Sequence, residues 1–155
     1  SSDFVKEINA DVEKITNNKS FSSTYKSKKK IIINLKDQKL YAYDDMGGEN
    51  KLFLETFISS GLDDTPTPIG TFKIFYKTPS RYMQGPIPEV SEQYYDLPGV
   101  PWTMYFTDGG AAIHGTYWHD NFGNKWSHGC INLYPYDAES LYKWADLGTE
   151  IIIQI

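Results

Sequence analysis

The chain has 155 residues, of which 40% are hydrophobic and 23% charged, a length and composition typical of one globular domain with its own core. Its formal net charge of −5 argues against a nucleic-acid-binding protein, because such a protein needs a basic face to neutralise phosphates. No apolar run approaches the ~20 residues of a membrane-spanning helix, and a single cysteine excludes an internal disulfide framework.

The first part of the chain is predicted to form an amphipathic helix followed by a polar linker. Apolar residues recur there at helical spacing, namely Phe4, Ile8, Val12 and Ile15. Residues 19–29 are rich in Ser and Lys, which is typical of a linker. We therefore expect an N-terminal helix and polar linker over residues 1–29 and a folded domain over residues 30–155.

From residue 31 onward the sequence predicts mainly β-strands. Short apolar or alternating runs are separated by polar turns that often contain glycine. The first two of these runs, and the fifth and sixth, are close enough to form hairpins. The expected strands are residues 31–35, 40–43, 52–58, 71–77, 102–106, 111–114 and 151–155.

Residues 78–101 contain five prolines and show no clear periodicity. A connection of this length is unusual inside a compact domain and predicts a functional lid or a disordered segment. Further on, Pro135 suits the first position of a helix, and Gly148 is placed to end that helix. The predicted fold class is therefore mostly β, with one main helix near the C-terminus and an N-terminal helix.

The candidate chemistry lies around the cysteine. All three histidines, His114, His119 and His128, fall within fifteen positions, and Cys130 follows at once. A lone cysteine is most often a small buried apolar side chain. Gly129, however, leaves the neighbouring backbone uncovered, so the amides of Gly129 and Cys130 could bind a substrate oxyanion. A histidine within reach would lower the pKa of the thiol, and together these neighbours favour a nucleophile.

The spacing leaves the general base and the role of a metal open. His128 would share a face with Cys130 if the segment were a strand, whereas His114 ends an apolar strand that could lie across from the thiol. Zinc is the rival chemistry, since three histidines and a cysteine are acceptable ligands. Their spacing nevertheless matches neither paired CxxC motifs nor an HExxH helix. His119, between Trp118 and Asp120, is more typical of a surface histidine.

Two motifs in this region resemble a known family. His114-Gly115-Thr116, followed by SHGCIN at residues 127–132, closely resembles the signature of L,D-transpeptidases, whose catalytic unit is the YkuD-type domain. Supporting segments follow the family's order, from IIINLKDQKLYAY through SSGLDDTPTPIGTFKI and LPGVPWTMYF to DAESLYKWADLGTEIII. The resemblance covers residues 31–155, and its specific part is the upstream His-Gly with Ser-His-Gly-Cys.

The resemblance implies a β-sandwich-like fold that carries a cysteine acyltransferase of bacterial peptidoglycan, so residues 30–155 would be the catalytic domain. Cys130 would be the nucleophile, His114 the general base and acid, and the carbonyl of Gly115 would orient His114. The backbone amides of His128, Gly129 and Cys130 would line the oxyanion hole. Ser127 and His128 would hold the loop in shape. The substrate-binding candidates are Asn132, Tyr82, Met83, Trp118 and Thr116, and Asn132 stands where many family members carry Arg.

The implied reaction is a ping-pong acyl transfer from a stem tetrapeptide, through a thioester, to the amine of a second stem, which forms a 3→3 cross-link. Water as acceptor would give an L,D-carboxypeptidase, and a protein lysine would give wall-protein attachment. A non-catalytic peptidoglycan-binding module is the remaining alternative. We expect a monomer without metal or cofactor whose partners are stem peptides and not nucleic acid. The resemblance also implies an exported protein of the periplasm or cell wall, with membrane contact only through an N-terminal signal or anchor absent from this sequence.

Overall fold

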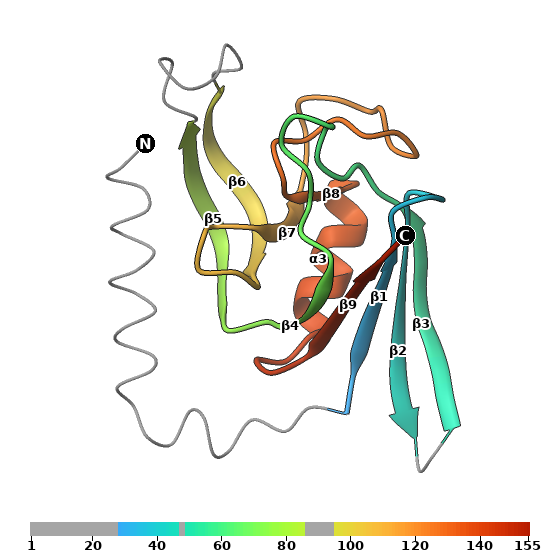
Figure 1. Ribbon diagram of the computed structural model, residues 1–155. Helices are drawn as coiled ribbons and strands as arrows, with labels where there is room; N and C mark the ends of the chain where they lie inside the picture. Colours follow the sequence, from blue (N-terminus) through green and yellow to red (C-terminus); the bar gives the residue numbers. More distant parts are fainter. Residues whose placement is uncertain (1–27, 47–48, 86–94) are drawn as a thin grey trace.

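The computed structural model describes residues 28–46, 49–85 and 95–155, and these residues form two β-sheets and one helix (Figure 1). The first sheet has the order β3-β2-β1-β9-β4 and contains β1 (Lys30–Asn34), β2 (Lys39–Met46), β3 (Glu49–Phe57), β4 (Gly70–Lys73) and β9 (Glu150–Gln154). The second has the order β5-β6-β7-β8 and contains β5 (Tyr76–Gly85), β6 (Tyr95–Tyr105), β7 (Ala112–Gly115) and β8 (Ile131–Leu133). The helix α3 spans Pro135–Trp144. The predicted mostly β fold with a helix near the C-terminus is confirmed.

Alternating apolar residues build the core from strands that are distant in sequence. Ile31 and Ile33 of β1 are fully buried and alternate with partly exposed neighbours, and Ile151 and Ile153 of β9 do the same. β1 and β9 pair in parallel, so these four side chains share one buried cluster with Leu141 of α3. Because α3 also contacts β6 and β7, its burial ties the first sheet to the second.

The pairing of β7 with β8, the last two strands of the second sheet, determines where the histidine and cysteine motifs meet. β7 and β8 pair in parallel, with His114 opposite Asn132 and Ile113 opposite Ile131. On its other side β8 is held by Ser59, which exchanges two backbone hydrogen bonds with Asn132 at 2.8 and 3.0 Å. Cys130, the residue before β8, therefore lies close to the strand that carries His114.

The predicted strand over residues 71–77 is divided between the two sheets. The amide of Ile74 donates to the carbonyl of Thr149 at 3.0 Å, whereas the next amide, that of Phe75, donates to the carbonyl of Tyr105 at 3.1 Å. The chain thus leaves β4 and the first sheet and enters β5 and the second sheet between adjacent residues. The prediction of a single strand is wrong because the local pattern does not change where the chain changes sheets.

The proline-rich segment also differs from its prediction. β5 and β6 form a long antiparallel hairpin, so the alternative of a disordered segment is wrong for residues 78–85 and 95–101, whereas the lid stays a prediction. The register shifts between Arg81 and Met83, and a bulge of this kind, together with the prolines, removes a clear period of two from the sequence. The remaining residues, 86–94, lie outside the described part of the chain, as does the predicted N-terminal helix.

Helix α3 begins at Pro135 as predicted but ends before Ala145, whose backbone is extended at φ −74° and ψ 130°. The side chain of Lys77, from β5, donates to the carbonyls of Tyr142 and Ala145 at 2.5 and 2.6 Å. These contacts satisfy carbonyls that the helix leaves unpaired at its end. Gly148, with φ +91°, lies in the turn that leads to β9 and does not end the helix. Among the described residues, no helix is both long and apolar enough to cross a membrane.

Candidate active site

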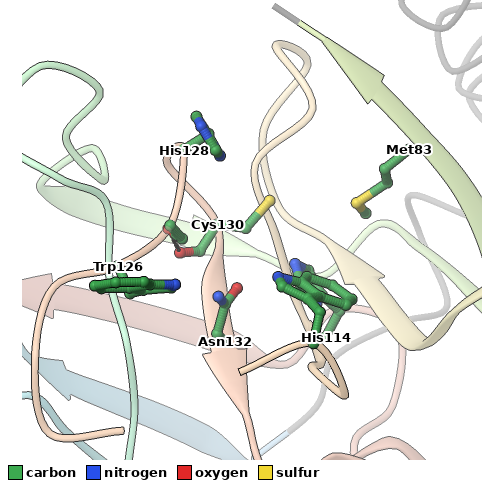
Figure 2. Close-up of a pocket in the computed structure, with 8 residues that line it drawn as sticks. Met83, His114, Trp126, His128, Cys130 and Asn132 are labelled. Carbon is green, nitrogen blue, oxygen red and sulfur yellow. Dashed lines mark hydrogen bonds between the residues drawn. The ribbon is translucent and has the colours of Figure 1, made fainter. Parts of the chain in front are cut away.

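A cavity of about 180 Å³ lies where β7 and β8 meet the segment that joins them (Figure 2). Its lining combines aromatic and apolar side chains with a few polar groups, as ligand sites usually do. The lining residues are Met83, His114, Trp118, Trp126, Ser127, His128, Cys130 and Asn132. Figure 2 shows the sulfur of Cys130 projecting into the space between His114, His128 and Met83. Folding therefore brings the thiol and two of the three histidines to one cavity.

The thiol of Cys130 is largely buried beside the second sheet. Its Sγ lies 3.8 Å from the carbonyl oxygen of Gly110, which can accept a weak hydrogen bond from the S–H group. Burial raises the pKa of Cys130 to about 11, and a hydrogen bond with the backbone of Ala112 offsets this only in part. The prediction of a lowered thiol pKa is therefore wrong, because the effect of burial exceeds that of the backbone hydrogen bond.

The imidazole of His114 is held in one orientation by its own strand. Its Nδ1 lies 2.9 Å from the carbonyl oxygen of Gly115, which can only accept, so Nδ1 carries the proton and Nε2 is the basic nitrogen. Burial lowers the pKa of His114 to about 4; the hydrogen bond with Gly115 opposes this, and nearby His119 adds to it. With 2% of its surface exposed, His114 is a neutral base at physiological pH.

The SHGC loop is shaped by the hydroxyl of Ser127. This Oγ donates to the carbonyl of Cys130 at 2.5 Å and accepts from the amide of Gly129 at 3.1 Å. Gly129 has φ +123°, a backbone conformation that a residue with a side chain rarely adopts. Because the Gly129 amide already donates to Ser127, it is engaged within the loop and does not point freely at the cavity. Burial lowers the pKa of His128, the other histidine of the loop.

A second loop supports the SHGC loop from behind. Thr67 is 4% exposed, and its hydroxyl accepts from the amide of Gly61 and donates to the carbonyl of Gly129, both at 2.9 Å. A Cβ on Gly61 would lie 2.0 Å from the carbonyl oxygen of Thr65 and 3.0 Å from the Cα of Gly129. Only glycine fits this close approach. The TPTPIG stretch, which the sequence links to the family only weakly, thus holds the loop that carries Cys130.

Asn132, which lines the cavity, pairs with His119 behind it. Asn132, 2% exposed on β8, has its Nδ2 3.0 Å from Nε2 of His119. The other ring nitrogen of His119, Nδ1, accepts a hydrogen bond from the amide of Asn121 at 2.9 Å. The Oδ1 atom of Asn132 is buried, and no group of the described residues donates a hydrogen bond to it. His119, expected as a surface histidine, therefore contacts a residue of the cavity wall.

The substrate-binding candidates divide into two groups. Met83, Trp118 and Asn132 line the cavity. Tyr82 does not, because neighbouring residues of a strand face opposite sides, and it is 47% exposed. Thr116 is 1% exposed, and its hydroxyl lies 3.4 Å from Nδ1 of His114, outside the cavity lining.

Sequence reasoning missed Trp126 as a cavity wall, although an aromatic residue directly before SHGC is a usable signal.

The zinc alternative gains no support from the arrangement of side chains. Within residues 28–46, 49–85 and 95–155, no three His, Cys, Asp or Glu side chains are grouped closely enough to hold a metal ion. The histidines instead face different partners, a carbonyl for His114 and an amide side chain for His119.

Comparisons with known proteins agree with this geometry. Residues 28–153 match the family described as YkuD, L,D-transpeptidase catalytic domain. A curated relative from Mycobacterium tuberculosis, named "Probable L,D-transpeptidase 3", is 33% identical over 101 residues, which are 62% of this chain and 37% of the relative. The chain thus spans little more than a third of that relative's length.

Solved structures show the same resemblance in three dimensions. An L,D-transpeptidase from Mycobacterium smegmatis is 26% identical with a TM-score of 0.73, over 83% of this chain and 59% of that chain. The L,D-transpeptidase LdtMt1 in complex with imipenem is also 26% identical with a TM-score of 0.73, over 82% of this chain and 59% of that chain. The described residues therefore share their fold with about three fifths of each structure.

Proposed function

Because the chain belongs to the L,D-transpeptidase catalytic-domain family, we propose that it is a cysteine-dependent L,D-transpeptidase acting on peptidoglycan stem tetrapeptides. The observation that carries this proposal is the cavity shared by the thiol of Cys130 and the imidazole of His114. The Nδ1 proton of that imidazole is held by Gly115, which leaves Nε2 to accept the proton of the thiol.

In the first step, Cys130 Sγ adds to the carbonyl that joins the L-centre of the stem's diamino acid to the terminal D-Ala. As the S–C bond forms, the thiol proton passes to Nε2 of His114. The C–N bond then breaks, and His114 returns that proton to the departing amine of D-Ala. The acyl group remains on sulfur as a thioester.

The two pKa values bear on the timing of this proton transfer. The thiol at about 11 and the imidazole at about 4 differ by about 7. At ~1.4 kcal/mol for each pKa unit, full transfer before attack would cost roughly 10 kcal/mol, less the attraction between the two ions formed. Transfer during attack avoids most of this cost, because negative charge develops on the carbonyl oxygen and not on sulfur.

Stabilisation of that oxygen would come from the backbone of the SHGC loop. Since the amide of Gly129 is bonded to Ser127, the donors that we assign are the amides of His128 and Cys130, with Ser127 holding the loop in shape. The carbonyl of Gly129 is fixed in turn by Thr67. A rigid donor set of this kind costs no reorganisation during the reaction, which is why such groups contribute strongly to catalysis.

In the second step, a side-chain amine of another stem attacks the thioester and gives its proton to His114. The C–S bond breaks, the sulfur takes the proton back, and a 3→3 cross-link is released. Met83, Trp118 and Asn132 would form the walls that hold the acyl donor. Because peptidoglycan lies outside the cytoplasmic membrane, we further propose an extracytoplasmic location.

Covalent labelling and product analysis test the proposal. Imipenem, the ligand of a solved relative, should add its mass to the wild-type chain and not to Cys130→Ser. A disaccharide-tetrapeptide should yield a cross-linked dimer that has lost one D-Ala, as seen by mass spectrometry. Loss of D-Ala without a dimer would indicate the carboxypeptidase instead. Neither adduct nor turnover in the wild type would favour a binding module and refute the enzyme.

A pair of histidine variants tests the assignment of the base. His114→Ala should abolish turnover, because no other group would accept the thiol proton, while His128→Ala should retain measurable turnover, because only its backbone is assigned a role. Both side chains line the cavity, so each is the matched control for the other. Equal residual rates in the two variants would contradict the assignment.

A further inference from the structure

In the contact between Asn132 and His119, two hydrogen-bond donors face each other, so no hydrogen bond can form with the present assignment of atoms. Nδ1 of His119 accepts a hydrogen bond from the amide of Asn121, so this nitrogen carries a lone pair and no proton. A neutral imidazole must then carry its proton on Nε2. The atom of Asn132 that lies 3.0 Å away is Nδ2, which is also a donor.

Exchange of the two ends of the Asn132 amide resolves the conflict. The oxygen and nitrogen of an asparagine side chain have almost the same shape, and their assignment follows from the hydrogen bonds that they make. After the exchange, Oδ1 accepts from Nε2–H of His119. The exchange also places the amide NH₂ group at the buried position where Oδ1 has no donor among the described residues, so this end of the side chain can donate and no longer accept.

The alternative, a doubly protonated His119, does not fit its surroundings. A charged ring would carry a proton on Nδ1, which would then face the amide proton of Asn121. Burial also lowers the pKa of His119, and this effect exceeds the opposing influence of Asp120. The ring is further fixed by Phe122, stacked at 5.2 Å and 28°, and by Trp126 at 5.7 Å.

We propose that His119 is a positioning residue that fixes Asn132 with its amide NH₂ group directed into the cavity. Figure 2 shows the Asn132 amide between Trp126 and His114, with its unpartnered end on the side of His114. That end becomes a donor with no acceptor role. It selects an acceptor oxygen of the acyl donor, either the terminal carboxylate of the D-Ala or a peptide carbonyl. This identification of the acceptor rests on the function proposed above, whereas the tautomer of His119 does not.

Nitrogen-15 NMR of the histidine rings tests the tautomer without any substrate. In the wild-type chain at pH 7, the signals that disappear in His119→Gln should show a protonated Nε2 and an unprotonated Nδ1. A protonated Nδ1 would overturn the proposal. Because this measurement needs no turnover, it decides the tautomer even if the wild-type chain fails to act on a tetrapeptide, an outcome that would count against the proposed function alone.

Kinetics of two variants test the positioning role. His119→Phe keeps an aromatic ring against Phe122 and Trp126 but removes the donor, so KM for the tetrapeptide should rise about 10-fold with a smaller change in kcat. His119→Gln can still donate through its side-chain amide, and its KM should return to within about 3-fold of wild type. Equal KM values in the Phe variant and the wild type, or no rescue by Gln, would refute the role.

A tetrapeptide whose terminal carboxylate is amidated distinguishes the two acceptors. If the carboxylate meets Asn132, amidation removes its charge and so weakens the hydrogen bond that His119→Phe loosens, and the combined effect on KM should be smaller than the product of the two separate effects. If a peptide carbonyl meets Asn132, the two effects should multiply. Thermal unfolding of each variant serves as a control, since a loss of stability alone would change the melting temperature and not the response to amidation.

Discussion

Replacement of Thr67 by Val is the sharpest test of how the catalytic loop is supported. Valine has nearly the shape of threonine but no hydroxyl, so the change removes the bonds to the amide of Gly61 and the carbonyl of Gly129. The amide of Gly61 is buried, and leaving it unpaired should cost ~1–3 kcal/mol. Gly129 is partly exposed, and the loss at its carbonyl should be ~1 kcal/mol. The free energy of unfolding should therefore fall by roughly 2–4 kcal/mol.

Urea unfolding followed by the fluorescence of the four tryptophans measures this loss, with linear extrapolation to water. Thr67→Ser, which keeps the hydroxyl, is the matched control and should lose less than about 1 kcal/mol. The Val variant should also acylate more slowly with imipenem, since the peptide of Gly129 is no longer held. A Val variant within about 0.5 kcal/mol of wild type, or a Ser variant equally destabilised, would refute the reasoning.

Two further predictions concern the helix end and the titration of the site. Lys77→Met removes the donors to the last carbonyls of α3 and should lower the free energy of unfolding by ~1–3 kcal/mol. Lys143→Met, at an exposed pair, should cost less than ~0.5 kcal/mol, and equal losses in urea unfolding would contradict the capping role. Because only the thiolate reacts and its pKa is raised to about 11, alkylation of Cys130 by iodoacetamide should quicken about tenfold per pH unit from 7 to 10. A plateau of the alkylation rate below pH 9 would argue against the buried thiol. Since His114 stays neutral down to about pH 4, turnover should not be lost through protonation of this base above pH 5.

Local sequence patterns were sufficient to predict the strands and the helix start whose partners are close in sequence. The hairpin of β1 and β2, the hairpin of β6 and β7 and the start of α3 all follow from alternation, turn residues and Pro135. The change of sheet between Ile74 and Phe75 was not predictable, because the pattern of side chains is the same on both sides of it. The end of α3 also escaped prediction, since Lys77 of another strand supplies the hydrogen bonds there.

For the site, the motifs are enough to predict which chemical groups are present and that Ser127 shapes the SHGC loop. The hydrogen bonds of the Ser127 hydroxyl with Gly129 and Cys130 are local, whereas the bond from Thr67 to the carbonyl of Gly129 joins residues distant in sequence. Tertiary structure alone decided that His114 shares a cavity with Cys130, that both are neutral at rest, and that His119 reaches Asn132. Burial and hydrogen-bond partners set these properties, and both arise from contacts between segments that only folding brings together.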